Sequence, residues 1–126
     1  MLPVRVLIAD DHELVRRGLS SLLSSRPGWE IIGEAKDGVE AVEMAKELRP
    51  DLILLDITMP RLNGLDAARA IREVEPEIPI LILSQHAPRE MSAKALEAGA
   101  QGYVSKSEVA VELFAAMEAI VHTESN

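Results

Sequence analysis

The stretch Asp51–Pro60, which reads DLILLDITMP, contains the two features that decide the fold. Its run Asp51–Leu55 is short and aliphatic, the pattern of a strand that is buried on both faces, as strands of parallel sheets are. The run leads directly into Asp56, and an ionised carboxylate at the end of a buried strand needs a partner. We therefore expect a central strand that brings an acidic side chain to the edge of a sheet.

Four other short apolar runs flank this stretch and also predict strands by their length and β-branched content. They are VRVLIA, WEIIGEA, PILILS and GYVS, at Val4–Ala9, Trp29–Ala35, Pro79–Ser84 and Gly102–Ser105. Segments with apolar residues at helical spacing lie between the runs, and proline or glycine separates the elements. The alternation predicts one α/β domain of five strand–helix repeats, in which helices cover both faces of a parallel sheet.

The first helical segment shows the spacing on which the helix predictions depend. Its predicted buried face consists of Leu14, Val15, Leu19, Leu22 and Leu23. Arg16 and Arg17 fall on the opposite side, where we expect solvent. Gly99 lies where a helix C-terminus favours a residue with positive φ, so we expect the fourth helix to end there.

Composition limits the classes of function that need consideration. The chain has 126 residues, 48% of them hydrophobic, no cysteine and a formal net charge of −8. The absence of cysteine excludes disulfides and thiolate metal sites, and the negative charge argues against direct nucleic-acid binding, which needs clustered Lys and Arg. No segment has the pattern of a signal peptide or the length of a membrane span. We expect a cytoplasmic protein with no membrane contact.

Polar side chains close four of the predicted strands. The first strand ends in Asp10 and Asp11, and the third ends in Asp56. Ser84 ends the fourth, and Lys106 follows the fifth. In an open parallel sheet, ligands bind outside the carboxyl ends of the strands, so these side chains should meet at one edge.

Each of these residues also has an ordinary structural explanation. Asp10 with Glu13 fits a capping box for the first helix, and Asp56 could be a turn residue. Ser84 could be a hydroxyl satisfied within the core, and Lys106 a solvated surface lysine. The combination points more strongly to a site than any member does, because independent accidents would not place complementary groups at four strand ends.

Electrostatics narrows the chemistry of such a site. Two carboxylates about 4 Å apart repel by roughly 4 kcal/mol at an effective dielectric constant near 20. A group of three must therefore raise a pKa or hold a cation, and an all-oxygen donor set suits Mg²⁺. A carboxylate beside Mg²⁺ and a lysine can act as a nucleophile toward phosphorus. We therefore interpret Asp56 as a phosphoacceptor.

Four pieces of the chain resemble the response-regulator receiver domain of bacterial two-component signalling. They are LIADDHELVRRGL, DLILLDITMPRLNGLDAARAI, ILILSQH and ALEAGAQGYVSK, and the variants DDHELVRRGL and LSQH resemble the NarL/LuxR branch. The resemblance implies the (βα)5 fold of CheY-like, flavodoxin-like domains. In that fold a parallel sheet with strand order 2-1-3-4-5 lies between two layers of helices, which gives a three-layer αβα architecture. Residues 1–122 would form the receiver domain, and residues 123–126 a terminal tail or the start of a linker.

The resemblance also implies a role for each residue of the site. Asp56 would accept a phosphoryl group from a sensor histidine kinase. Asp11, Asp56 and the backbone carbonyl of Thr58 would bind Mg²⁺, and Asp10 would act largely through water. Lys106 would pair with the phosphoryl oxygens.

Further residues would transmit or tune the signal. Ser84 would move toward the phosphate and Tyr103 would then turn inward, which changes the face formed by the fourth helix, the fifth strand and the fifth helix. Thr58 and His86 would modulate how fast the phosphate hydrolyses. His12 is expected to be a surface residue. Many receivers carry proline after the active-site lysine, and Ser107 stands there instead, which implies a reoriented start of the fifth helix.

The function implied is that of a signalling phosphoacceptor and not of an enzyme, although the domain would assist its own phosphorylation and dephosphorylation. The expected output is transcription through a DNA-binding domain outside this chain, with homodimer formation on phosphorylation. The alternatives are a phosphorylation-independent interaction module and a stand-alone regulator. A hydrolase of the haloacid-dehalogenase type would need an aspartate two residues after Asp56, where Thr58 stands, and no P-loop or G-x-G-x-x-G is present.

Overall fold

Strands and helices alternate along the whole of the computed structural model, which describes residues 2–85 and 88–124, and side-chain burial for 2–85 and 91–121. The strands are β1 (Val4–Ala9), β2 (Trp29–Ala35), β3 (Leu52–Asp56), β4 (Ile80–Ser84) and β5 (Gly102–Ser105). The helices are α1 (Glu13–Ser24), α2 (Gly38–Leu48), α3 (Gly64–Val74), α4 (Pro88–Glu97) and α5 (Val109–Glu124). A 3₁₀ turn, η1 (Lys106–Glu108), precedes α5.

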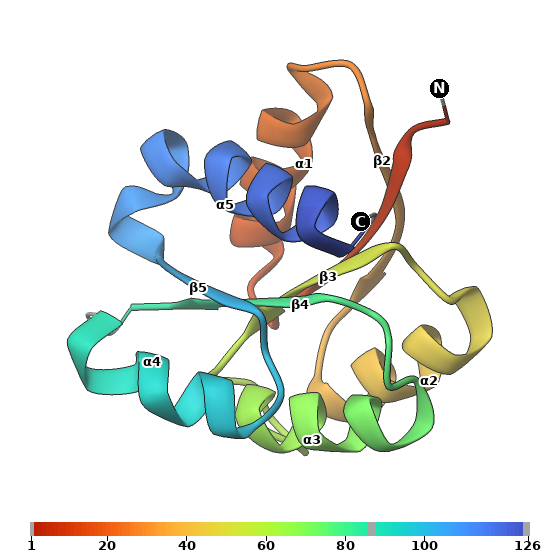
Figure 1. Ribbon diagram of the computed structural model, residues 1–126, viewed down its shortest axis with the longest axis vertical. Helices are drawn as coiled ribbons and strands as arrows, with labels where there is room; N and C mark the ends of the chain where they lie inside the picture. Colours follow the sequence, from red (N-terminus) through yellow and green to blue (C-terminus); the bar gives the residue numbers. More distant parts are fainter. Residues whose placement is uncertain (1, 86–87, 125–126) are drawn as a thin grey trace.

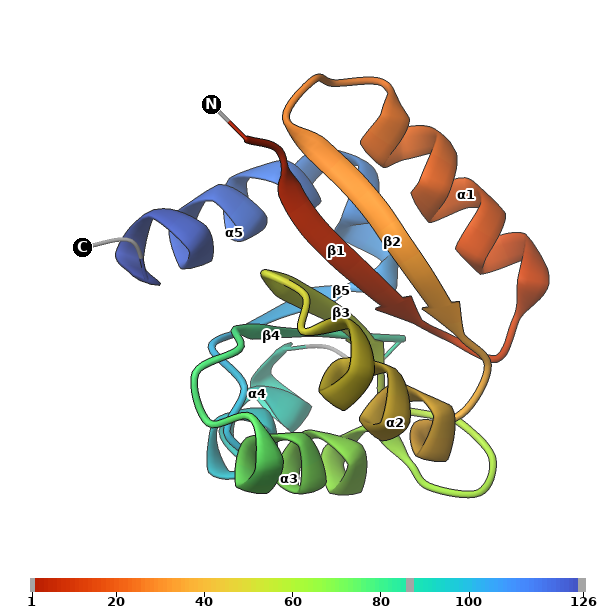
Figure 2. The same cartoon turned by 90° about the vertical axis from the view of Figure 1, so that its right-hand side faces the viewer.

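The strands form one parallel sheet in the order β2-β1-β3-β4-β5, as predicted. Helices α1 and α5 cover one face of this sheet, and α2, α3 and α4 cover the other (Figure 1). This arrangement confirms the three-layer, doubly wound architecture. Figure 2 shows the carboxyl ends of β1 and β2 at the same edge, where the chain leaves for α1 and α2.

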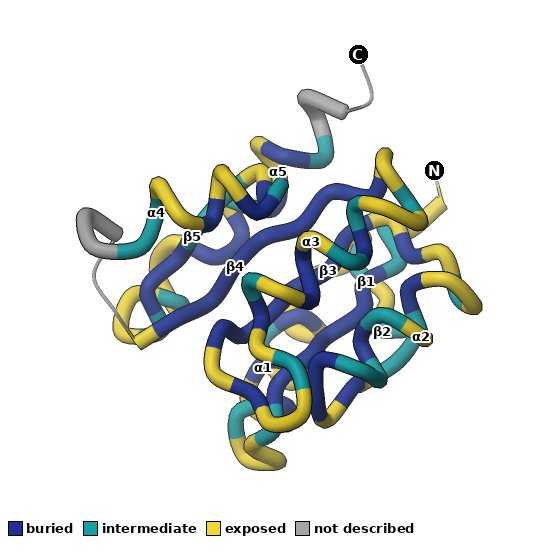
Figure 3. Tube along the Cα trace, turned by 90° about the horizontal axis from the view of Figure 1, so that it is seen from below, coloured by how far each residue is buried: buried dark blue, intermediate teal, exposed yellow. Residues whose placement is uncertain are grey.

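Strand β3 occupies the centre of the sheet and is buried along its whole length (Figure 3). Leu52 and Leu54 pack into the apolar cluster beneath α1 and α5. Ile53 and Leu55 pack into the cluster beneath α2, α3 and α4. A strand with two buried faces has no polar alternation, which is why the run appeared in the sequence as an unbroken aliphatic segment.

Strands β3 and β4 each begin one residue later than predicted. Asp51 lies outside β3 at the exposed amino edge, where its carboxylate accepts the Arg5 N–H at 2.9 Å. The strand ends at Asp56, the residue that was predicted to close it. Strand β4 begins at Ile80 and not at Pro79, a residue that has no N–H to donate.

Helix α1 departs from its predicted faces. Arg16 was expected in solvent but is only 8% exposed, and Leu14 was expected in the core but is 80% exposed. The buried residues of α1 are Arg16, Leu19 and Leu23, spaced by three and four as on one helix face. Arg16 can occupy the first of these positions because its guanidinium finds hydrogen-bond partners there.

The predicted capping box at the start of α1 is also absent. The N-cap residue is His12, which makes no side-chain capping hydrogen bond. Asp10 lies two residues earlier, and its Oδ1 accepts the His12 N–H at 2.8 Å. The carboxylate therefore orders the turn before the helix and does not cap the helix.

The end of α4 agrees with the sequence. Gly99 adopts φ +98°, and the N–H groups of Gly99 and Ala100 donate to the carbonyls of Leu96 and Ala95 at 3.0 Å each. This pattern is a Schellman motif, in which a glycine with positive φ satisfies the last carbonyls of a helix. Within the described part of the chain, no helix combines the length and the apolar character that crossing a membrane requires.

Candidate functional site

The side chains predicted to share a site lie together at the carboxyl edge of the sheet. Asp10 follows β1 and is fully buried, and Asp56 ends β3 with 3% of its surface exposed. Ser84 ends β4 and is 1% exposed, and Lys106 begins η1 directly after β5. Because parallel strands end at the same edge, the topology brings these groups together from distant parts of the sequence.

Lys106 links two of the carboxylates. Its Nζ lies 2.9 Å from Oδ2 of Asp10 and 3.2 Å from Oδ1 of Asp56. The lysine side chain is only 16% exposed, so water screens these contacts much less than those of a surface ion pair. The prediction that Lys106 faces Asp56 is supported, and its interpretation as a solvated surface lysine is wrong.

Asp10 is held on every side. Its two carboxylate oxygens take hydrogen bonds from the His12 N–H at 2.8 Å and from Lys106 at 2.9 Å. Its backbone carbonyl accepts a hydrogen bond from Arg16 Nη1 at 2.6 Å, and its N–H donates to the carbonyl of Ala35 at 3.0 Å. A charged group with no exposed surface needs such partners, and here they fix its orientation.

Asp56 is less fully satisfied. Its Oδ2 is buried and has no hydrogen-bond partner within the described residues. Burial raises the pKa of this carboxyl above its ordinary value of 3.8, and the negative charge of Asp10 raises it further. The charge and hydrogen bond of Lys106 and the backbone of Thr58 act in the opposite direction without cancelling the rise in pKa. An unpartnered buried oxygen is an available ligand or nucleophile.

The protonation of Lys106 is secured by the two carboxylates. Burial alone would lower the pKa of this ammonium group. The hydrogen bond to Asp10 and the charges of Asp56 and Asp10 outweigh burial, so the pKa lies above the ordinary value of 10.5. Lys106 therefore carries its positive charge throughout the neutral range.

The acidic residues of this edge fit a divalent cation. Oxygen or nitrogen atoms of Asp10, Asp11, His12 and Asp56 lie within 4.8 Å of one another. The unpartnered Oδ2 of Asp56 gives this group a ligand atom that no protein donor occupies. Carboxylate oxygens are the donors that Mg²⁺ prefers, and a cation would relieve the repulsion between them.

His12 was expected to be a surface residue, and its side chain is indeed 62% exposed. Its Nδ1 nevertheless lies 3.1 Å from Oδ1 of Asp11 and 3.4 Å from Oδ1 of Asp10. The contact of His12 with the acidic group was not predicted. Its position directly after the Asp10–Asp11 pair was the available signal, because the turn before α1 folds the ring back toward the two carboxylates.

Three further residues were predicted to tune the phosphate lifetime or to transmit the signal: Thr58, Tyr103 and His86. Thr58 is exposed in the loop after β3. Tyr103 on β5 is half-buried and packs against the core cluster beneath α4. It also lines a hollow of about 290 Å³ together with residues of α4. His86, predicted to modulate phosphate hydrolysis, lies outside the described residues.

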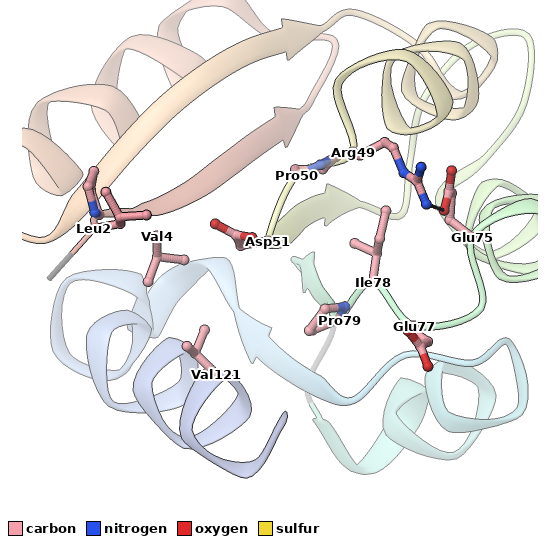
Figure 4. Close-up of a pocket in the computed structure, with 11 residues that line it drawn as sticks. Leu2, Val4, Arg49, Pro50, Asp51, Glu75, Glu77, Ile78, Pro79 and Val121 are labelled. Atoms are coloured by element: carbon pink, nitrogen blue, oxygen red, sulfur yellow. Dashed lines mark ion pairs between the residues drawn. The ribbon is translucent and has the colours of Figure 1, made fainter. Parts of the chain in front are cut away.

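A larger hollow of about 640 Å³ lies at the opposite, amino edge of the sheet (Figure 4). Three of its charged groups engage one another or the backbone: Arg49 lies 3.5 Å from Glu75, and the N–H of Arg5 donates to the Asp51 carboxylate at 2.9 Å. The mutually supporting carboxylates, lysine and hydroxyl occur instead at the carboxyl edge, which we take as the functional site.

Comparisons with known proteins identify the family to which the chain is similar. The family described as Response regulator receiver domain matches residues 6–118. The transcriptional regulatory protein YdfI of Bacillus subtilis is 41% identical over 117 residues, which are 93% of this chain and 54% of that protein. The chain thus spans just over half the length of the first curated relatives it matches.

Solved structures give the same family. The receiver domain of the response regulator NarL from Mycobacterium tuberculosis is 34% identical, with a TM-score of 0.90 and coverage of 97% of this chain and 98% of that one. The receiver domain of the sensor histidine kinase PA1611 from Pseudomonas aeruginosa has a magnesium ion coordinated in its active-site cleft. It is 28% identical, with a TM-score of 0.84 and coverage of 95% and 98%.

Proposed function

This chain belongs to the family of response regulator receiver domains, the phosphoacceptor modules of two-component signalling, and we propose that Asp56 is its phosphorylated residue. One observation carries the assignment. Asp56 ends the central strand with Oδ1 against Lys106 at 3.2 Å and with Oδ2 buried and unpartnered within the described residues. Asp10 has both carboxylate oxygens engaged by protein donors, which makes it the poorer nucleophile of the two buried carboxylates.

The donor would be a phosphohistidine of a sensor kinase. In the transfer, an oxygen of Asp56 forms a bond to phosphorus while the bond from phosphorus to the histidine nitrogen breaks. The electron pair of that bond returns to the imidazole. The protein would contribute alignment and charge neutralisation, which is the main requirement of phosphoryl transfer. Lys106 is placed to neutralise the charge on the transferred group, because its Nζ already lies beside Oδ1 of Asp56.

The metal required would be Mg²⁺. Asp11, Asp56 and the backbone carbonyl of Thr58 would hold it, with Asp10 acting through water. When bound, the cation offsets negative charge between the phosphoryl oxygens and the carboxylates. The clustered donor atoms and the unpartnered oxygen of Asp56 support this proposal.

Phosphorylation would be read out through Ser84 and Tyr103. Ser84 is buried at the end of β4 beside the site, and Tyr103 is half-buried beneath α4. A new phosphoryl group within reach of a hydroxyl can bias a two-state packing of such an aromatic side chain. Thr58 and His86 would control water access to the phosphate and therefore its lifetime.

The wider biology is proposed from the relatives. Residues 1–122 would be the receiver domain and residues 123–126 a tail or linker start. Because longer relatives, of which this chain matches just over half, are transcriptional regulators, we propose a transcriptional output through a DNA-binding domain, with a homodimer formed on phosphorylation. The protein would act in the cytoplasm as a signalling module whose chemistry is limited to its own phosphorylation and dephosphorylation.

The testing experiment is intact-mass spectrometry after incubation with a small-molecule phosphodonor, with and without Mg²⁺, on the wild type and Asp56→Asn. We expect the wild type to gain one phosphoryl group only with Mg²⁺, and the variant to gain none. Asp51→Asn is the matched control, because Asp51 directly precedes the same strand, at the opposite edge of the sheet. A folded wild type that binds Mg²⁺ but never gains mass would favour the phosphorylation-independent interaction module.

A further inference from the structure

Arg16 is a buried cation that the proposed phosphoryl chemistry does not use. It lies in the first turns of α1 and is 8% exposed, although its neighbour Arg17 has a side chain that is 70% exposed. Its Nη1 donates to the backbone carbonyl of Asp10 at 2.6 Å, and this hydrogen bond is itself buried. Its Nε donates to Oε1 of Glu34 at 3.2 Å. A long cationic side chain is rarely held inside a protein unless such partners require it.

The position of Glu34 depends on an irregularity of the sheet. The pairing of β1 with β2 shifts by one residue after Val6, which leaves Ile32 as an extra residue on β2. Glu34 therefore pairs with Ile8, and Ile8 belongs to the sheet face that α1 covers. Without the extra residue, Glu34 would pair with Ala9 and face α2, because side chains alternate between the two faces. The bulge thus turns a carboxylate toward α1.

The carbonyl that Arg16 holds belongs to the turn that carries the acidic side chains. The peptide unit is planar, so fixing the carbonyl of Asp10 also fixes the orientation of the bond that leads to Asp11. Oδ1 of Asp10 accepts the His12 N–H two residues later, at 2.8 Å. One hydrogen bond from Arg16 therefore restrains the turn Asp10–His12, from which three of the clustered metal-ligating side chains project.

We propose that Arg16 is a positioning residue for divalent-cation binding: it holds the Asp10–His12 turn in its ligating arrangement, and Glu34 holds Arg16 in place. This inference rests on the proposed function, because it takes the acidic cluster to be the metal site. Arg16 touches neither a ligand oxygen nor the phosphoacceptor in the contacts described, so it acts through the backbone of Asp10. Groups that orient metal ligands in this way are as much a part of a metal site as the ligands.

The test compares four variants by calorimetric titration with Mg²⁺ and by the amide chemical shift of His12. Arg16→Met keeps the apolar stem and removes the guanidinium, whereas Arg16→Lys keeps a donor able to reach a carbonyl. Glu34→Gln removes the charge that anchors Arg16. Arg17→Met is the matched control, because Arg17 is the adjacent arginine of α1 and pairs only with Glu13 in the contacts described.

We expect Arg16→Met to weaken Mg²⁺ binding by about tenfold or more, the effect typical of losing a group that orients a metal ligand. Its His12 amide signal should move, Arg16→Lys should recover most of the affinity, and Arg17→Met should match the wild type. If folded Arg16→Met binds Mg²⁺ as the wild type does, the inference is wrong. If Arg16→Met does not fold, Glu34→Gln decides: weaker binding supports the inference, and unchanged binding overturns it.

The wild type separates this inference from the proposed function. A wild type that takes up a phosphoryl group with Mg²⁺, while folded Arg16→Met does so with the same Mg²⁺ requirement, would refute the role of Arg16 alone. A wild type that binds no Mg²⁺ and takes up no phosphoryl group would refute the proposed function, and the inference with it.

Discussion

The Nζ of Lys106 lies 3.2 Å from Oδ1 of Asp56, and this contact works against the two influences that favour a neutral Asp56. Burial and the charge of Asp10 both raise the pKa of Asp56, whereas the lysine lowers it. A phosphoacceptor must be ionised to act as a nucleophile, so Lys106 has a role before the phosphoryl group arrives as well as the role of neutralising its charge. It also helps to keep the nucleophile charged in the resting protein.

Replacing Lys106 by methionine should therefore slow phosphoryl uptake for two reasons. The charge on the transferred group loses its neutralising partner, a loss that typically costs about 10²-fold or more in rate. The pKa of Asp56 should also rise further, which leaves less of it ionised. The rate of phosphorylation by a small-molecule donor, followed by mass spectrometry at saturating Mg²⁺, measures the effect. Lys46→Met, an exposed lysine of α2, is the control, and equal rates in both variants would contradict the role of Lys106.

Asp56→Asn should make the folded protein more stable at neutral pH. The substitution removes the cost of burying an ionised carboxylate and its repulsion with Asp10, but also the attraction to Lys106, so we expect a net gain of about 1 kcal/mol. Urea unfolding followed through Trp29, the single tryptophan of the chain, gives the free energy of unfolding. A variant less stable than the wild type at neutral pH would show that the attraction to Lys106 dominates.

The difference in stability between Asp56→Asn and the wild type should depend on pH. The pKa of Asp56 is raised above 3.8 in the folded state, so the folded wild type keeps this proton at pH values where the unfolded chain has lost it. Its contribution to stability is complete below about pH 3.8 and is lost as the pH rises through the folded pKa. The advantage of Asp56→Asn should thus grow as the pH rises from 3.8 and then level off. An advantage that is constant or shrinks with rising pH would mean that the pKa of Asp56 is not raised.

The fold could be predicted from the sequence because its strongest signals are local. Each strand buried on both faces appeared as an uninterrupted aliphatic run, and Gly99 marked the end of α4 through its positive φ. Asp51 lies just outside β3, where its carboxylate accepts the N–H of Arg5, a contact between segments far apart in the sequence. No pattern within the run Asp51–Leu55 contains that information.

The site was predictable as far as strand ends decide it. The order of the strands brings Asp10, Asp56 and Lys106 to one edge whatever their neighbours are. Arg16 was predicted to face solvent because arginine is polar, and the spacing of apolar residues in a helix does not show whether hydrogen-bond acceptors are available to a buried arginine. Its burial depends on the bulge that turns Glu34 toward α1, and a bulge arises from the pairing of two strands. Sequence periodicity within either segment could not show it.

Ser84 and Ser105 offer a matched test of the proposed switch. They are buried partners on neighbouring strands, but the hydroxyl of Ser105 is 3.0 Å from that of Ser107 and has no part in the proposed switch. Ser84→Ala should still take up the phosphoryl group, yet the ring signals of Tyr103 in NMR spectra should no longer change on phosphorylation. Ser105→Ala should keep that change. If the Tyr103 signals respond equally in both variants, Ser84 does not transmit the phosphorylation state.

Gly64, the first residue of α3, lies against the backbone that carries Asp56. A Cβ at Gly64 would lie 2.1 Å from the carbonyl oxygen of Asp56 and 2.7 Å from Cα of Ile57, so the backbone of one segment would have to move. Gly64 also donates its N–H to the carbonyl of Ile57 at 2.7 Å, which ties the start of α3 to the end of β3. Gly64→Ala should therefore reduce the free energy of unfolding by about 1 to 3 kcal/mol, as overpacking does. It should also slow phosphoryl uptake, because the displaced strand end carries the phosphoacceptor.

Gly18→Ala is the matched substitution, since a Cβ at Gly18 in α1 would meet nothing within 4 Å. An alanine in this exposed helical position should stabilise the protein by about 0.5 to 1 kcal/mol, because glycine loses more conformational freedom on folding. Its phosphorylation rate should equal that of the wild type. Urea unfolding and the rate of mass gain, measured on both variants, separate the two cases. If Gly64→Ala is as stable and as fast as Gly18→Ala, the close approach of α3 to β3 does not position Asp56.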